Sequence, residues 1–117
     1  ADSASSVTHF QQAANKADYR HEVTFLRRNL FDAPLRAEEL VGIGCAIIDP
    51  PRSGASLQIR EVIKAHTPSV AMISCNPHSF ARDAQQLLAA GYKCEWLRMI
   101  DQFHLTPHTE LVARFAL

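Results

Sequence analysis

The run Ser69-Val70-Ala71-Met72-Ile73, which leads into Ser74-Cys75-Asn76-Pro77, has the pattern of a strand that ends just before a helix begins. Its first five residues are mostly apolar and partly β-branched, which is typical of a buried strand. Asn76-Pro77 interrupts that pattern, and the spacing of residues 78–90 predicts a helix. Cys75 is therefore expected at the carboxyl edge of a sheet, where open α/β folds bind their ligands and where a nucleophile can reach them.

On both sides of this run, short apolar segments alternate with segments of helical spacing. We expect strands over residues 22–27, 45–49, 70–74, 92–100 and 110–117, helices over residues 6–17, 55–66 and 78–90, and a helical turn over residues 36–41. Strands separated by helices in this way indicate an α/β protein with a mostly parallel sheet covered on both faces. Gly91 follows the third helix, at the position where a left-handed cap is usually needed.

Composition limits the kinds of partner that the chain can attract. The 117 residues include twelve basic and twelve acidic side chains, so there is no net charge to draw in a phosphate backbone, and contact with nucleic acid would need a local patch. The three cysteines, Cys45, Cys75 and Cys94, are far apart and show no CxxC spacing, which indicates neither a disulfide framework nor a zinc site. Together with the lack of a long apolar run or a signal pattern, this predicts a cytoplasmic protein.

Two further segments join the cysteine motif. Upstream lies Ile48-Asp49-Pro50-Pro51-Arg52-Ser53-Gly54, and downstream lies Asp101-Gln102-Phe103-His104-Leu105-Thr106-Pro107-His108-Thr109-Glu110. In this order and at roughly this spacing, the three motifs resemble the signature of the S-adenosylmethionine-dependent RNA uracil-5-methyltransferases, which make 5-methyluridine in tRNA and ribosomal RNA. The resemblance covers most of the chain and is strongest over residues 45–117.

The resemblance implies a fold and a place within it. The family has the class I methyltransferase fold, a Rossmann-like α/β sheet with helices on both faces and an antiparallel last strand, and the two final expected strands, with no helix between them, agree with that ending. The glycines of Gly42-Ile43-Gly44 precede a strand instead of following one, so they do not match the glycine-rich cofactor turn. Residues 1–117 are therefore expected to be the C-terminal portion of the catalytic domain, truncated at the N-terminus, without the first strand, that turn or the RNA-binding domain.

The resemblance also implies a mechanism. C5 of uracil is a poor nucleophile, so its electron density must first be raised, and a thiolate that adds to C6 does this. Cys75 would be that nucleophile, and Glu110 would be the base that removes the C5 proton.

Five other residues receive binding roles from the same resemblance, with S-adenosylmethionine as cofactor and RNA as partner. Asp49 would lie between the cofactor and the target base, and Asp2 could bind the cofactor's ribose hydroxyls. Asn29 stands where the family often has an aspartate near the adenine. Arg52 and Asn76 are expected on the substrate side, although Arg52 could equally stabilise its own loop.

Other functions compete with this interpretation. Asp-Pro-Pro also resembles the loop of amino methyltransferases that act on adenine or cytosine, but Arg52 stands where those enzymes stack an aromatic ring. A cysteine hydrolase could use Cys75 with His108, although no oxyanion motif accompanies them. The chain could also be a catalytically silent structural unit, or a homodimer joined through an exposed sheet edge.

Each site residue also has a purely structural interpretation. Cys75 could be a small core residue, Glu110 a solvated strand end and Asp49 the cap of a turn. The histidines show no spacing that would suggest a metal site, so no metal is expected.

Overall fold

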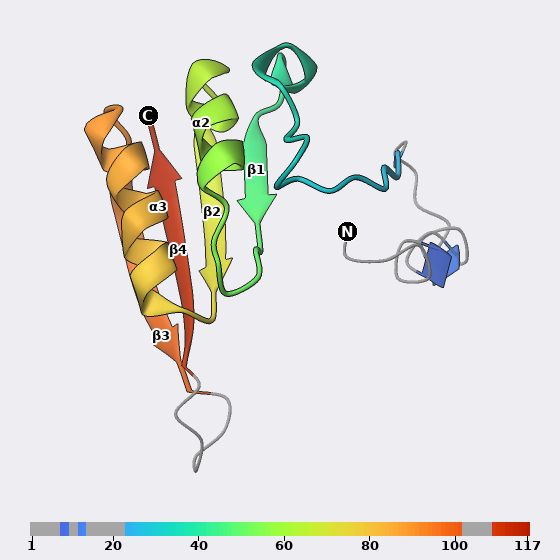
Figure 1. Ribbon diagram of the computed structural model, residues 1–117. Helices are drawn as coiled ribbons and strands as arrows, with labels where there is room; N and C mark the ends of the chain where they lie inside the picture. Colours follow the sequence, from blue (N-terminus) through green and yellow to red (C-terminus); the bar gives the residue numbers. More distant parts are fainter. Residues whose placement is uncertain (1–7, 10–11, 14–22, 102–108) are drawn as a thin grey trace. The chain divides into compact units, whose positions relative to one another are not determined.

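The computed structural model describes residues 8–9, 12–13, 23–101 and 109–117, and the chain divides into two units, Ala1–Pro34 and Leu35–Leu117. The second unit contains, in chain order, the 3-10 helix η1 (Ala37–Leu40), β1 (Cys45–Ile48), α2 (Ser56–Lys64), β2 (Ser69–Ser74), α3 (Pro77–Ala89), β3 (Lys93–Ile100) and β4 (Glu110–Ala116) (Figure 1). These bounds lie within about two residues of those expected from the sequence.

The four strands form one mixed sheet in the order β1-β2-β4-β3 (Figure 1). β1 and β2 are parallel, whereas β4 lies between β2 and β3 and runs antiparallel to both. The antiparallel last strand is therefore confirmed. Among the described residues β1 has a neighbour on one side only, so it forms an edge of this sheet.

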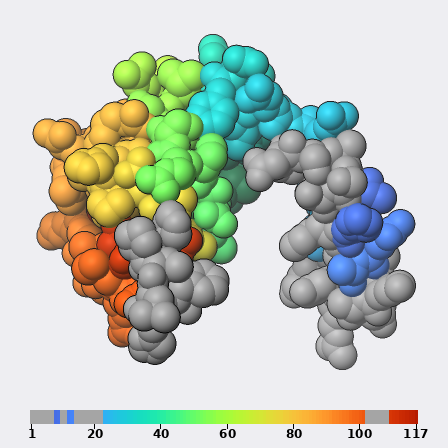
Figure 2. Space-filling view, turned by 60° about the horizontal axis from the view of Figure 1, so that its bottom comes forward, coloured from blue at the N-terminus to red at the C-terminus, as the bar shows by residue number. Residues whose placement is uncertain are grey.

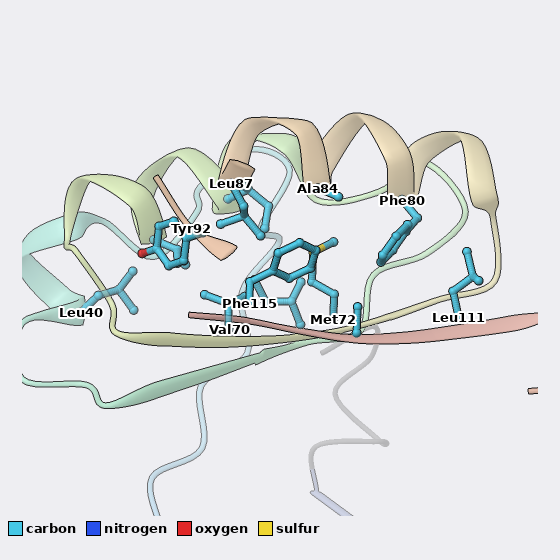
Figure 3. Packing of buried hydrophobic residues seen from close by; sticks show 13 residues of the cluster. Leu40, Val70, Met72, Phe80, Ala84, Leu87, Tyr92, Leu111 and Phe115 are labelled. Carbon is cyan, nitrogen blue, oxygen red and sulfur yellow. The ribbon is translucent and has the colours of Figure 1, made fainter. Parts of the chain in front are cut away.

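The helices α2 and α3 pack together on one face of the sheet, as Figure 3 shows. Both connect parallel strands, β1 to β2 and β2 to β3, and both connections cross the sheet in the same direction. Since such crossovers are right-handed, two that run in the same direction must lie on the same face. We expected helices on both faces of the sheet. Within the described residues of this unit, helices cover one face only.

The core lies between this face and the helices. Buried residues alternate along β2 and β4, so one side of each strand faces the helices. Figure 3 shows Val70, Met72 and Phe115 on the sheet opposite Ala84 and Leu87 of α3. The fully buried side chains of this layer include Phe115, Ile59, Met72, Leu87, Val62 and Val70. The buried layer fixes which side of each strand faces the helices and thereby the strand register.

Phe115→Ala is expected to lower the free energy of unfolding by about 3–5 kcal/mol, because it leaves a cavity where a buried ring packed. Phe115 is 1% exposed, and its ring centroid lies 6.4 Å from that of Phe80. Urea unfolding measures the loss. Phe31→Ala is the control, because Phe31 is 48% exposed and lies in the other unit. Equal losses for the two variants would contradict this placement of the core.

Side chains of α2 hold the residues that enter the second unit. The amide of Gln58 both accepts from the Leu35 N–H, at 2.9 Å, and donates to the Leu35 carbonyl, at 3.0 Å. The Ala37 N–H donates to the Glu61 carboxylate at 2.9 Å. This hydrogen bond is the main reason why the pKa of the Glu61 carboxyl lies below its ordinary value. Buried polar groups on α2 thus satisfy backbone groups that no strand pairs.

The first unit departs from the expectations in one place. Residues 8, 9, 12 and 13, the described part of the helix expected over residues 6–17, are helical. The strand expected over residues 22–27 is wrong for its described part, because residues 23–27 adopt no regular structure. The apolar side chains there gave the pattern of a strand, but a strand also needs a neighbour to pair with, and the described sheet does not include this segment. None of the helices among the described residues has the length and apolar character needed to cross a bilayer.

Candidate functional site

Three of the expected site residues lie at the end of the sheet where β1 and β2 finish and β4 begins. Asp49 comes directly after β1, Cys75 comes directly after β2, and Glu110 is the first residue of β4. Because β4 runs antiparallel to the other two strands, its start lies at the edge where they end. The sheet therefore brings together residues that are 26 and 35 positions apart in the sequence (75 minus 49 and 110 minus 75).

Cys75 and Glu110 come directly after the last pair of the β2–β4 ladder. The last recorded pair of the β2–β4 ladder is Ser74 with Leu111, so the next position along the ladder sets Cys75 opposite Glu110. Directly opposite residues of an antiparallel pair have Cα atoms about 4.5–5.5 Å apart. Both residues are half-buried, and the Cys75 thiol is free. The ladder thus brings the backbone positions of a thiol and a carboxylate to the same end of the sheet.

The turn that carries Cys75 is built by its two neighbours. The Asn76 N–H donates to the Ser74 hydroxyl oxygen at 3.1 Å, and the Asn76 side-chain oxygen accepts from the His78 N–H at 3.1 Å. Asn76 is thereby the N-cap of α3, and Pro77 occupies the first turn, where its missing N–H costs nothing. The sequence Ser-Cys-Asn-Pro ends the strand, leaves the cysteine half-buried and starts the helix within four residues.

The loop after β1 is tied to this turn. The Asn76 side-chain amide donates to the Arg52 carbonyl at 2.8 Å, so one asparagine caps α3 and also holds the loop beside Cys75. Figure 2 shows the green residues that follow β1 against the yellow residues at the start of α3. Asp49 and Arg52 are both exposed, and within the described residues neither side chain has a hydrogen bond or ion pair.

A second set of contacts, which the sequence did not lead us to expect, holds the end of the same loop. Arg82 of α3 donates from Nη2 to the Ser53 carbonyl at 2.7 Å, and the Asp83 carboxylate accepts from the Ala55 N–H at 2.7 Å. Asp83 is 0% exposed and Gly54 is buried beneath this pair. The available signal was the position of Asp83 on α3, since it falls on the buried stripe that also contains Phe80, Ala84 and Leu87.

Gly54→Ala is expected to destabilise the protein by about 1–3 kcal/mol more than Gly42→Ala, because only the first creates an overpacked contact. Both glycines have a φ of 84°, so both substitutions place a side chain in the left-handed region. A Cβ on Gly54 would lie 2.5 Å from Arg82 Nη2 and 2.7 Å from Asp83 Oδ2, whereas one on Gly42 meets nothing within 4 Å. Urea unfolding of the two variants gives the difference, and equal losses would show that the loop is not packed against α3.

The remaining expected site residues are placed as follows. Asn29 lies in the first unit, at the start of a turn in which its side chain accepts from the Phe31 N–H at 3.0 Å and donates to Asp32 at 3.0 Å. Asp2 and His108 lie outside the described residues. Among the residues that the structure describes, no group of three or more histidine, cysteine, aspartate or glutamate side chains could hold a metal ion.

Comparison with known proteins gives three kinds of match. The family model for tRNA (uracil-5-)-methyltransferase matches residues 19–114. An uncharacterized RNA methyltransferase of Zymomonas mobilis is 43% identical over 88 residues, which cover 75% of this chain and 22% of the relative. A 23S rRNA (uracil(1939)-C(5))-methyltransferase of Yersinia enterocolitica is 38% identical over 94 residues, which cover 80% of this chain and 21% of that enzyme.

Among solved structures, the Pyrococcus abyssi tRNA (uracil-54, C5)-methyltransferase in complex with S-adenosyl-L-homocysteine superposes with a TM-score of 0.80 at 23% identity. The match covers 97% of this chain and 27% of that one, and it establishes that the two share a fold. The chain spans about a quarter of the length of the curated relatives that it matches.

Proposed function

The chain belongs to the tRNA (uracil-5-)-methyltransferase family, and from this membership we propose that it forms part of an enzyme that methylates C5 of a uridine in tRNA or ribosomal RNA. The observation that carries the proposal is the register of β2 and β4, which sets Cys75 opposite Glu110. A nucleophile and a base within reach of one another are what a covalent mechanism at neighbouring carbon atoms requires. Asp49 lies at the same edge of the sheet.

The residues at this edge fit part of a site for S-adenosylmethionine, which, when bound, supplies the methyl group that C5 receives. Asp49 has an exposed carboxylate without a partner among the described residues, and it follows a parallel strand, where folds of this type bind nucleotides. It can therefore accept hydrogen bonds from the cofactor or the base.

Cys75 and Glu110 then act in sequence on the uracil ring. The Cys75 thiolate adds to C6, a C–S bond forms, and the electron pair of the C5–C6 double bond moves into the enolate of the ring. C5 could then form its bond to the methyl carbon while the bond from that carbon to the sulfonium sulfur breaks, which would leave a neutral thioether. Glu110 removes the C5 proton, the C5–C6 double bond forms again, and the C6–S bond breaks to release Cys75 as a thiolate.

Arg52 supplies a local positive charge in a chain that has no net charge. Its guanidinium is exposed and has no partner within the described residues, while its carbonyl is held by Asn76. A fixed backbone with a free guanidinium suits contact with a phosphate of the RNA beside the flipped base. Asn76 contributes by fixing this loop, and one hydrogen of its amide stays available for the substrate.

The test is nucleoside analysis of the product. The full-length protein that contains these residues is incubated with S-adenosylmethionine and with separate transcripts of tRNA and 23S ribosomal RNA, which are then digested and analysed by mass spectrometry. We expect 5-methyluridine from one of the transcripts. Methylated adenosine or cytidine in its place would identify an amino methyltransferase, and no methylated nucleoside from either transcript would contradict the proposal.

A further inference from the structure

We propose that Arg82 and Asp83 of α3 are positioning residues that hold the Asp49-to-Gly54 loop in register with Cys75, an inference that rests on the proposed function. Neither residue lies at the edge of the sheet where the reaction is placed, and both act through the backbone of the loop. We call the pair, together with the loop atoms that it binds, the loop latch. Its members are Arg82, Asp83, the Ser53 carbonyl and the Ala55 N–H.

The loop latch holds the backbone groups on either side of Gly54. Arg82 Nη2 donates to the Ser53 carbonyl at 2.7 Å, and Asp83 Oδ2 accepts from the Ala55 N–H at 2.7 Å, so the residues on both sides of Gly54 are held. Arg82 also contacts Asp83 Oδ1, through Nε at 3.4 Å and Nη2 at 3.3 Å. The Gly54 N–H closes the turn itself by donating to the Pro51 carbonyl at 2.9 Å.

Burial explains why this arrangement is specific. The Asp83 side chain is 1% exposed, and a buried carboxylate is costly unless hydrogen bonds and an opposite charge compensate it. Its partners are Arg82 and the backbone N–H of Ala55, the N-cap of α2, a helix with no side-chain cap of its own. The Arg82 side chain is 52% exposed, so only the carboxylate of the pair is buried, and its hydrogen bonds to fixed groups favour one geometry. Here the selected geometry is that of the loop.

The latch and the Cys75 turn belong to the same helix. Asn76, the N-cap of α3, donates to the Arg52 carbonyl at 2.8 Å, and Arg82 and Asp83 lie further along the same helix. The loop is therefore bound at two points to the element that begins next to the nucleophile. Asp49 and Arg52 have no side-chain partner among the described residues, so the backbone of their loop alone sets where they stand relative to Cys75. Misplacement by about 1 Å can reduce a rate by about 100-fold.

The experiment measures positioning separately from folding and from thiol reactivity. In the full-length protein that contains these residues, we compare Arg82→Ala, Arg82→Lys, and Arg82→Ala combined with Asp83→Asn. Gln85→Ala is the control, because Gln85 is exposed on the same helix and bonds to nothing among the described residues. Three quantities are recorded for each variant: the rate of adduct formation on Cys75 with an RNA oligonucleotide that contains 5-fluorouridine, the rate of Cys75 alkylation by iodoacetamide, and the melting temperature.

We expect Arg82→Ala to slow adduct formation at least about tenfold while the alkylation rate changes less than about twofold. Arg82→Lys should recover part of the rate, because an ammonium group can still donate to the Ser53 carbonyl. The double variant removes the unpaired buried charge, so it should regain melting temperature without regaining the rate. Gln85→Ala should leave all three quantities unchanged.

Several results would overturn the inference. Unchanged adduct formation in Arg82→Ala, or equal loss of adduct formation, alkylation and melting temperature, would show that the pair is structural only, and the proposed function would stand. Full recovery of the rate by the double variant would assign the loss to the unpaired charge. No adduct with the unsubstituted protein would overturn the proposed function, and this inference with it.

Discussion

Replacing Cys75 by alanine is expected to abolish uridine methylation, with a loss on the order of 10⁴-fold or more, as when other covalent enzymes lose their nucleophile. Without the thiolate, the C5–C6 double bond of uracil is not activated. The measurement is transfer of a labelled methyl group from S-adenosylmethionine to RNA by the full-length protein that contains these residues.

The chain supplies matched controls for this variant. Cys45 and Cys94 are free and exposed, so Cys45→Ala and Cys94→Ala remove a thiol of the same kind elsewhere on the sheet. Both are expected to keep the activity of the unsubstituted protein. Retained turnover in Cys75→Ala would show that Cys75 is a structural residue and that the covalent mechanism is wrong.

Glu110→Gln is expected to stop the reaction one step later. Cys75 can still add to C6 and C5 can still be methylated, but the C5 proton is no longer removed, so the C6–S bond persists. We expect turnover to fall by about 10²–10⁴-fold while a covalent complex of protein and RNA accumulates. Denaturing gel electrophoresis with labelled RNA detects the complex.

Glu38→Gln is the control for Glu110→Gln, because Glu38 is an exposed glutamate of η1, away from the sheet edge. Glu38→Gln should methylate RNA at the rate of the unsubstituted protein and should accumulate no covalent complex with RNA. If Glu110→Gln lost activity without trapping RNA, Glu110 would be needed before the covalent step, which would contradict its role as the base for the C5 proton.

The fold could be predicted where local pattern and burial agree. The apolar runs before Asp49 and Cys75 became β1 and β2, and Gly91 adopts a φ of 98° after α3, as its position after a helix predicted. Residues 23–27 have the same kind of apolar pattern but form no strand, because pairing depends on a neighbour that local sequence does not reveal. The placement of α2 and α3 on one face follows from the handedness of the crossovers and not from the residue pattern.

Some residues of the candidate site could also be located from the sequence, and others could not. Strand ends located Asp49, Cys75 and Glu110, because the carboxyl ends of parallel strands meet at one edge and an antiparallel strand begins there. Asp83 had one signal, its position on the buried stripe of α3, but adjacent opposite charges on a helix usually belong to its solvated face, and nothing in the sequence indicated the partners of Arg82 and Asp83. Their role depends on contacts to residues 53 and 55, 28 or 29 positions away in sequence.

The central claim is that Cys75 attacks C6 of uracil, and the most direct test uses an RNA oligonucleotide that contains 5-fluorouridine, whose C5 fluorine cannot be removed as a proton. The full-length protein that contains these residues is incubated with this RNA and S-adenosylmethionine, digested, and analysed by mass spectrometry. We predict one stable adduct, with the mass of the nucleotide plus a methyl group, on the peptide that contains Cys75. An adduct on Cys45 or Cys94, or no adduct, would contradict the account.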